Sequence, residues 1–179
     1  MASPISCLSI LVIPLLVTSL FYHASNADQA LIESVCEKST NNVSCLSTFR
    51  SDPRSSTADL YTLGIISADL NLKVFEEANS QIPNLLASLT DSLDRSRLLN
   101  CQTNLTDAHK TMITVKNLAE AKSYSEEDKI IWNAFTNIQH CTNEYKVPPI
   151  RQSPISNLTS KMEDLIIISR NILEMIDSL

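Results

Sequence analysis

The sequence predicts an all-α protein, an antiparallel up-and-down four-helix bundle preceded by an N-terminal disulfide-closed helical hairpin. The first observation is that the 179 residues include a single glycine, Gly64, whereas hairpin-rich β folds use glycine repeatedly for positive φ angles. The second is that apolar residues recur at alternating spacings of three and four through four long segments. This spacing places side chains on one face of a helix, and four such helices with short connections pack as an antiparallel bundle.

The N-terminus has the features of a secretory signal peptide. Residues 7–21 are apolar and uncharged, and the small residues Ser25 and Ala27 stand where a signal peptidase reads the chain. We therefore expect residues 1–27 to be a signal peptide that is cleaved after Ala27. A transmembrane anchor is the alternative, but the apolar run contains Pro14 and is shorter than the roughly 20 residues that a spanning helix needs. Residues 28–179 are enough for one domain with a hydrophobic core.

Four cysteines follow the predicted signal peptide, and an even number in a secreted chain predicts two disulfide bonds. Residues 28–50 are too short for long helices, and a bridge between Cys36 and Cys45 would close them into a small hairpin. Cys101 and Cys141 fall in the apolar registers of two later helices, so a bridge between them would lock those helices together. A metal site is the alternative, but it would need two ligand pairs at short spacing, which Cys101 and Cys141 do not provide.

The bundle helices are expected over residues 57–82, 92–121, 125–146 and 156–179. Ser56 and Thr57 precede the first helix, with Asp59 in its first turn, and Ser125 precedes three carboxylates that suit the N-terminus of the third. Pro83 ends or kinks the first helix, and the proline-rich residues 147–154 form the loop before the last. The apolar registers are Leu60, Leu63, Ser67, Leu70 and Val74; Leu98, Cys101, Leu105, Ala108, Met112, Val115 and Ala119; Ile131, Ala134, Ile138, Cys141 and Tyr145; and Leu158, Met162, Leu165, Ser169, Ile172 and Ile176.

Charge and motif content point to binding rather than catalysis. A formal net charge of −6 at pH 7 gives no electrostatic basis for binding nucleic acid or an anionic membrane. The sequence has no GxGxxG, P-loop or HExxH motif, and paired cysteines are not nucleophiles. His109 and His140 are expected on helix surfaces, and Glu126, Glu127 and Asp128 are better explained as a helix N-terminal turn than as a cation site. We expect no catalytic residue, no metal and no cofactor.

Two further groups of residues are candidates for contact with the outside. Trp132 and Phe135 flank the core register of the third helix, where they either pack against the bundle or form an aromatic patch that faces a partner. Three sequons, at Asn42, Asn104 and Asn157, agree with secretion and are predicted glycosylation sites.

Several stretches occur in an order that is typical of one plant family. A signal peptide is followed by the Cys36 to Cys45 hairpin, then by "FRSDPRSSTADLYTLGIISADL" (49–70), "LLNCQ" (98–102) and "HCTNEY" (140–145). Over all of residues 28–179 this resembles the plant invertase inhibitor and pectin methylesterase inhibitor family, and "TADLYTLGIISADL" is similar to the invertase inhibitors that include pollen allergens. The resemblance implies a four-helix bundle with an N-terminal hairpin, disulfides Cys36–Cys45 and Cys101–Cys141, and a secreted, non-catalytic inhibitor that blocks the substrate cleft of a carbohydrate-active enzyme.

The resemblance leaves two target enzymes open. Invertase inhibitors typically carry a Pro-Lys-Phe motif before the third bundle helix, and this motif enters the invertase active site. The corresponding stretch here is "KSYSEED" (122–128), which has Lys122 but neither proline nor phenylalanine, although Tyr124 could take part of the aromatic role. Pectin methylesterase inhibitors lack the motif and bind through a bundle face that includes parts of the second and third helices, here the exposed positions of 102–118 and 125–142.

The resemblance therefore implies a pectin methylesterase as the partner in a one-to-one complex. An acid invertase of the cell wall or vacuole is the alternative, and a secreted bundle that inhibits neither enzyme is a third possibility. We expect the protein in the apoplast, with the vacuole as the alternative compartment. The candidate partner-binding residues are Lys122, Tyr124, Ser125, Glu126, Trp132 and Phe135.

Overall fold

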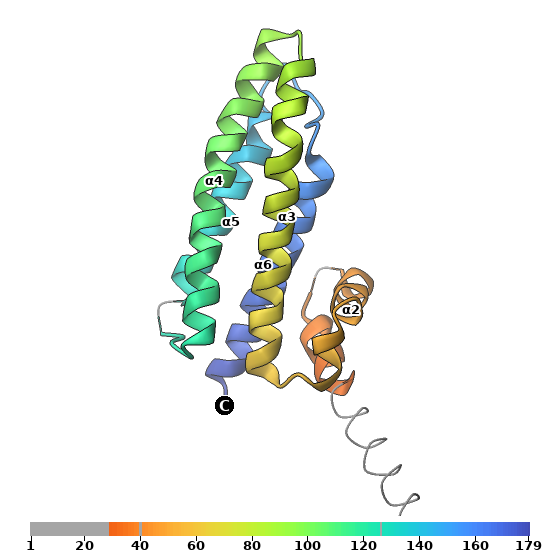
Figure 1. Cartoon of the computed structure of the whole chain (residues 1–179), viewed down its shortest axis with the longest axis vertical. Helices are drawn as coiled ribbons and strands as arrows, with labels where there is room; N and C mark the ends of the chain where they lie inside the picture. Colours follow the sequence, from red (N-terminus) through yellow and green to blue (C-terminus); the bar gives the residue numbers. More distant parts are fainter. Residues whose placement is uncertain (1–28, 40, 126) are drawn as a thin grey trace, which may run out of the picture.

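The computed structural model describes residues 29–39, 41–125 and 127–179, and these residues form helices and turns with no β-strand. A helical segment over residues 29–37 is followed by α2 (Asn42–Arg50), the 3-10 helix η1 (Pro53–Thr57), α3 (Leu60–Ser88), α4 (Ser92–Glu120), α5 (Glu127–Glu144) and α6 (Ser156–Asp177). Consecutive long helices pack side by side and α6 returns to α3, in the up-and-down arrangement of Figure 1. The expected all-α bundle is confirmed, whereas the predicted signal peptide, residues 1–27, lies outside the described residues.

The core of the bundle is built from the predicted apolar registers. Every member of these registers is buried except Leu70 and Leu158, which are half-buried. The two polar members, Ser67 of α3 and Ser169 of α6, form a hydrogen bond between their hydroxyl groups, and the Ser169 hydroxyl also donates to the carbonyl of Leu165 at 3.0 Å. Because buried hydroxyls are costly only when they lack partners, the core accommodates this pair.

Two aspartates set the starts of the first two long helices. The helix α3 begins at Leu60, later than the expected residue 57, because Asp59 is the N-cap rather than a member of the first turn. Its carboxylate accepts a hydrogen bond from the backbone N–H of Thr62 at 2.7 Å. Asp91 caps α4 in the same way, and its carboxylate accepts hydrogen bonds from the backbone N–H groups of Leu93 and Asp94. Such caps satisfy N–H groups that have no partner inside the helix.

Pro83 lies inside α3, which continues to Ser88, so this proline does not end the helix. A proline inside a helix removes one backbone hydrogen bond. Ile82, immediately before it, is fully buried, and Leu86, one turn later, packs against the core. Burial of apolar side chains on both sides of Pro83 offsets the missing bond.

The N-terminal hairpin packs on the end of the bundle where α3 begins and α6 ends (Figure 1). A disulfide joins Cys36, at the end of the first helical segment, to Cys45 in α2, with the two Cα atoms 5.5 Å apart. Ile32, Val35 and Phe49 of the hairpin are buried in the same apolar cluster as the bundle core. The hairpin is therefore part of the domain's core.

An ion-pair network connects η1 to the bundle. Asp69 of α3 lies between Arg54 of η1 and Lys116 of α4, and both nitrogen–oxygen distances are 2.7 Å. Arg54 also pairs with Asp52 at 2.7 Å, and the hydrogen bonds from Arg54 lower the pKa of the Asp52 carboxyl to about 2. The linker between hairpin and bundle is thus paired directly with α3 and, through Asp69, with α4.

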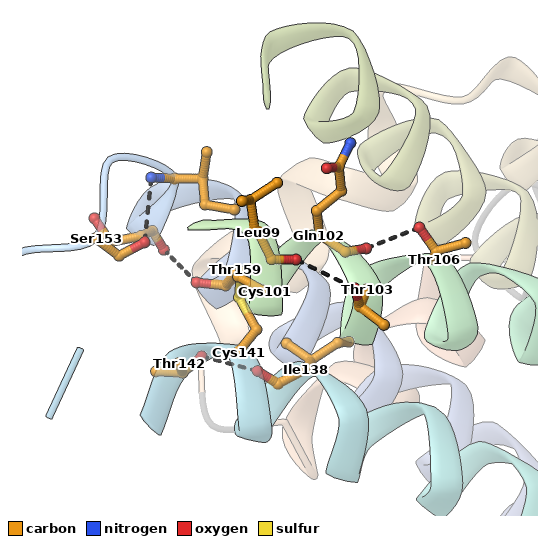
Figure 2. The surroundings of a disulfide bond; sticks show 12 residues. Leu99, Cys101, Gln102, Thr103, Thr106, Ile138, Cys141, Thr142, Ser153 and Thr159 are labelled. Carbon is orange, nitrogen blue, oxygen red and sulfur yellow. Dashed lines mark hydrogen bonds between the residues drawn. A yellow bond between two sulfur atoms is a disulfide. The ribbon is translucent and has the colours of Figure 1, made fainter. Parts of the chain in front are cut away.

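At the opposite end of the bundle, α4 is fixed to α5 by a disulfide and to the loop after α5 by an arginine. Figure 2 shows Cys101 of α4 and Cys141 of α5, which are joined by the second disulfide. One turn before Cys101, the buried Arg97 donates hydrogen bonds to the carbonyls of Val147 at 2.8 Å and Pro149 at 2.9 Å. This arginine holds the proline-rich loop between α5 and α6 against α4.

Candidate partner-binding surface

The helices α4 and α5 pack side by side, and we call the exposed positions of residues 102–118 and 127–142 the α4–α5 surface. All four threonines of α4 lie within residues 102–118. Thr103 and Thr114 are exposed, and Thr106 and Thr111 are half-buried. Each of their hydroxyls donates to the backbone carbonyl four residues earlier, at 2.8 to 3.3 Å; Figure 2 shows the first two of these bonds. Because the hydroxyls are engaged and the side chains are β-branched, these positions are restrained before any partner arrives.

Few charges are available on this surface in free form. Lys110 is paired with Asp107 one turn away, at 3.1 Å. On α5, the amide nitrogen of Asn137 donates to the backbone carbonyl and the side-chain oxygen of Asn133, both at 3.2 Å, and His140 is exposed. Lys129 of α5 is exposed as well, and Ile113 of α4 adds an exposed apolar side chain. The surface is therefore mixed, with a minority of charged side chains.

An aromatic cluster lies where this surface meets α6. Trp132 is 48% exposed, and its ring stacks on Phe135 with ring centroids 5.0 Å apart. The guanidinium of Arg170 in α6 lies 5.3 Å from the Trp132 ring centroid and pairs with Asp128 at 2.9 Å and Glu174 at 3.4 Å. Phe135 packs partly against the core, whereas Trp132 presents much of its ring to solvent. Aromatic and arginine side chains in such clusters are the types that dominate interface energies.

The connection between α4 and α5 forms a second, separate cluster. Lys122 has a positive φ of 53°, and its Nζ lies 4.8 Å from the ring centroid of Tyr61 in α3. Tyr124 is half-buried, with its ring 5.7 Å from that of Tyr61 and its hydroxyl donating to the carbonyl of Ala119 at 3.2 Å. Ser125 is exposed, and Glu126 lies outside the described residues. Lys122 and Tyr124 thus contact α3 and α4, whereas Trp132 contacts α6.

The three sequons occupy different environments. Asn42 and Asn157 are exposed in the first turns of α2 and α6. Asn104 is half-buried in the middle of α4, next to the fully buried Leu105. A glycan at Asn104 would cover part of the α4–α5 surface, whereas Asn42 and Asn157 lie on other helices.

The described residues show neither a metal site nor a free thiol. Within residues 29–39, 41–125 and 127–179, no group of three or more histidine, cysteine, aspartate or glutamate side chains is arranged to hold a metal ion. The thiols of Cys36, Cys45, Cys101 and Cys141 are all consumed in disulfides. In the same part of the chain, no helix combines the length and the apolar character that crossing a membrane requires.

Sequence reasoning missed three residues that organise these clusters. Arg170 orients Trp132, Tyr61 holds the connection between α4 and α5, and Arg97 holds the loop after α5. Arg97 precedes Leu98 in the apolar register, and a charged residue beside a core position was a signal that could have been used. The contacts of Arg170 and Tyr61 depend on the relative heights of neighbouring helices, which periodicity within each helix does not determine.

Comparisons with known proteins agree with the fold described above. The chain matches the family model described as plant invertase/pectin methylesterase inhibitor over residues 30–175. A pectinesterase inhibitor of Actinidia deliciosa is 28% identical over 158 residues, which cover 88% of this chain and 85% of that protein. A crystal structure of mutant form A of a pectin methylesterase inhibitor from Arabidopsis matches with a TM-score of 0.71, and the match covers 80% of this chain and 95% of that chain. A second, of a pectin methylesterase inhibitor from Arabidopsis thaliana, has a TM-score of 0.61 and covers 82% and 95%. Both structures are 14% identical to this chain, a level at which the likeness shows the fold alone.

Proposed function

The chain belongs to the plant invertase/pectin methylesterase inhibitor family, and from this premise we propose that it inhibits a pectin methylesterase by covering its substrate cleft in a one-to-one complex. The members of this family are inhibitors rather than enzymes. The observation that carries the choice of target is that a relative matched over 88% of this chain is a pectinesterase inhibitor. We further propose that the protein is secreted to the apoplast, and that Asn42, Asn104 and Asn157 are its glycosylation sites.

The α4–α5 surface supports a mechanism of rigid docking. Its threonine hydroxyls are bonded to their own helix, and the Cys101–Cys141 disulfide joins the two helices that carry it. Association is weakened by the entropy lost when side chains and loops become ordered, so a surface that is ordered beforehand binds more tightly. This mechanism requires no movement of the inhibitor's backbone.

The connection between α4 and α5 supports pectin methylesterase over invertase. In family members that insert a Pro-Lys-Phe motif into invertase, this part of the chain has to reach into the enzyme. Here Lys122 lies over the Tyr61 ring and Tyr124 is half-buried with its hydroxyl bonded to Ala119. Insertion would first have to break these contacts, which adds an energetic cost that docking through the helices avoids.

The test is a paired titration of residues 28–179, produced with both disulfides closed, against a plant pectin methylesterase and a plant acid invertase in mildly acidic buffer. We expect stoichiometric loss of pectin methylesterase activity and no loss of invertase activity. Loss of invertase activity alone would show that "KSYSEED" can replace the Pro-Lys-Phe motif. If the folded protein inhibits neither enzyme, the proposal is wrong and the non-inhibitory bundle remains.

Substitutions on the two candidate surfaces would then locate the contact. Thr114→Arg places a long charged side chain on the α4–α5 surface, and Thr90→Arg, in the exposed turn before α4, is its matched control. We expect Thr114→Arg to weaken inhibition at least tenfold and Thr90→Arg to leave it unchanged. Trp132→Ala tests the aromatic cluster. A large effect of Trp132→Ala without an effect of Thr114→Arg would move the contact to the side of α6.

A further inference from the structure

One carboxyl group is enclosed at the end of the bundle where α5 begins. Glu127 is only 5% exposed, and its Oε2 is buried without a hydrogen-bond partner among the described residues. The space beside it has a volume of about 10 Å³, room for one water molecule at most. The space is enclosed by Gly64 of α3, Val115 and Ala119 of α4, Tyr124 and residues of the C-terminal half of α6.

The charged groups around Glu127 do not compensate its carboxylate. From α6, Asp177 adds a second negative charge that disfavours ionisation of Glu127. On α5 itself, Asp128 is paired with Arg170. On α4, the ammonium of Lys116 is paired with a carboxylate of α3 and lies 3.8 Å from Glu120. None of the described residues that line the space beside Glu127 is a lysine, arginine or histidine.

The remaining neighbours belong to α3 and to the connection between α4 and α5. From α3, Gly64 lines the space and carries no charge, while the Tyr61 ring holds the ammonium of Lys122. From the connection, Tyr124 lies against Glu127 as a neutral phenol. Burial raises the pKa of that phenol, and the negative charges of Glu127 and of Asp59 in the cap of α3 would raise it further. The enclosure therefore suits a protonated carboxyl group better than a carboxylate.

We propose that Glu127 is an acid-dependent lock on this end of the bundle. The connection between α4 and α5 stays docked on α3 while the Glu127 carboxyl is protonated, and it opens when that carboxyl ionises and takes up water. The lock acts on the segment that carries Lys122 and Tyr124, and it does not depend on which enzyme the protein inhibits. It would keep the inhibitor closed in an acidic cell wall and loosen it at neutral pH.

The pH dependence of the opening equilibrium follows from the difference in the pKa of Glu127 between the closed and open forms. Burial, with a smaller contribution from Asp177, raises the pKa of Glu127 from 4.5 to about 7 in the closed form, and this outweighs the N-terminal dipole of α5, which favours the carboxylate. Below about pH 4.5 both forms hold the proton and the lock is at full strength. Between about pH 4.5 and 7 only the closed form holds the proton, so opening becomes roughly tenfold more favourable for each pH unit and levels off at roughly 300-fold.

The experiment is hydrogen–deuterium exchange of the full mature chain, followed in peptides that span residues 118–131 and corrected for the intrinsic pH dependence of exchange. Between pH 5.5 and 8, the protection of these amides in the wild type should fall roughly 30-fold. Glu127→Gln keeps the shape of the side chain without a charge, so its protection should be nearly the same at both pH values. Asp128→Asn removes the neighbouring exposed carboxylate and should retain the fall seen in the wild type.

Two results would overturn the proposal. One is a pH-independent protection of residues 118–131 in the wild type, and the other is an equal fall in the wild type and Glu127→Gln. The wild type alone gives a second measurement, the carbon-13 NMR titration of the Glu127 carboxyl, which does not rely on the folding of a variant. A midpoint near 7 supports the lock, and a midpoint near 4.5 rejects it.

Discussion

The two disulfides close loops of very different length, and this difference predicts their separate contributions to stability. Cys36 and Cys45 are 9 residues apart, whereas Cys101 and Cys141 are 40 apart. A bridge stabilises the fold chiefly by reducing the conformational entropy of the unfolded chain, and this effect grows with the logarithm of loop length. The relation gives about 2.6 kcal/mol for the hairpin bridge and about 4 kcal/mol for the bridge between α4 and α5.

The perturbation is a pair of double variants, Cys36→Ala/Cys45→Ala and Cys101→Ala/Cys141→Ala. All four cysteines are fully buried, so each variant removes two sulfur atoms from an enclosed site and the cost of the resulting cavities is similar. The free energies of unfolding in water are measured by urea denaturation at one pH and compared with the wild type. We expect the second variant to be less stable than the first by about 1.3 kcal/mol.

The reasoning is refuted if the variant without the hairpin disulfide is as unstable as the variant without the disulfide between α4 and α5, or more so. Because the hairpin residues belong to the same apolar cluster as the bundle, such a result would mean that the hairpin bridge acts through the folded state. The slope of the denaturation curve distinguishes the two cases, since a more expanded unfolded chain gives a steeper dependence on urea.

Two further substitutions test the arginine below the proline-rich loop and the cap of α3. Arg97→Met should lower the free energy of unfolding by about 3 kcal/mol, because two charge-assisted hydrogen bonds to loop carbonyls are lost. It should also speed proteolysis within residues 147–154. Arg151→Met, at an exposed arginine of the same loop, should have neither effect, and equal effects of the two substitutions would contradict the role assigned to Arg97. Asp59→Ala should cost about 1 kcal/mol at pH 7. Hydrogen bonds from Thr62 lower the pKa of Asp59, so this contribution is present above the ordinary pKa of about 4 and is lost as the pH falls through the lowered value. The stabilities of wild type and variant are compared by thermal unfolding. A stability difference that persists undiminished to pH 2 would be incompatible with a charged cap.

Periodicity was sufficient to predict the bundle and its core, because each apolar register is a property of one helix. It also contained information about Glu127 that the interpretation as an exposed first turn overlooked. Glu127 lies four residues before Ile131 and so continues the 3-4 register of α5 backwards into the core. The structure buries it accordingly.

The interhelical contacts could not be predicted in this way. The contact of Arg170 with Trp132, and the position of Asp69 between Arg54 and Lys116, depend on how far each helix is shifted along its neighbour. Loop lengths and bulky core side chains together determine these shifts, and neither is visible in the spacing of apolar residues. The aromatic cluster was therefore predicted by residue type, while its partner on α6 was not.

The hydrogen-bonded threonines of α4 affect the dehydration of the α4–α5 surface when a complex forms there. A hydroxyl that already donates to a backbone carbonyl needs no new acceptor when its hydration shell is removed, and the methyl group of each threonine contributes apolar area. Dehydration of such a surface produces the negative heat-capacity change of apolar burial. It also depends little on ionic strength, because few free charges are screened. A complex formed there would keep its affinity while the concentration of counterions around it changes.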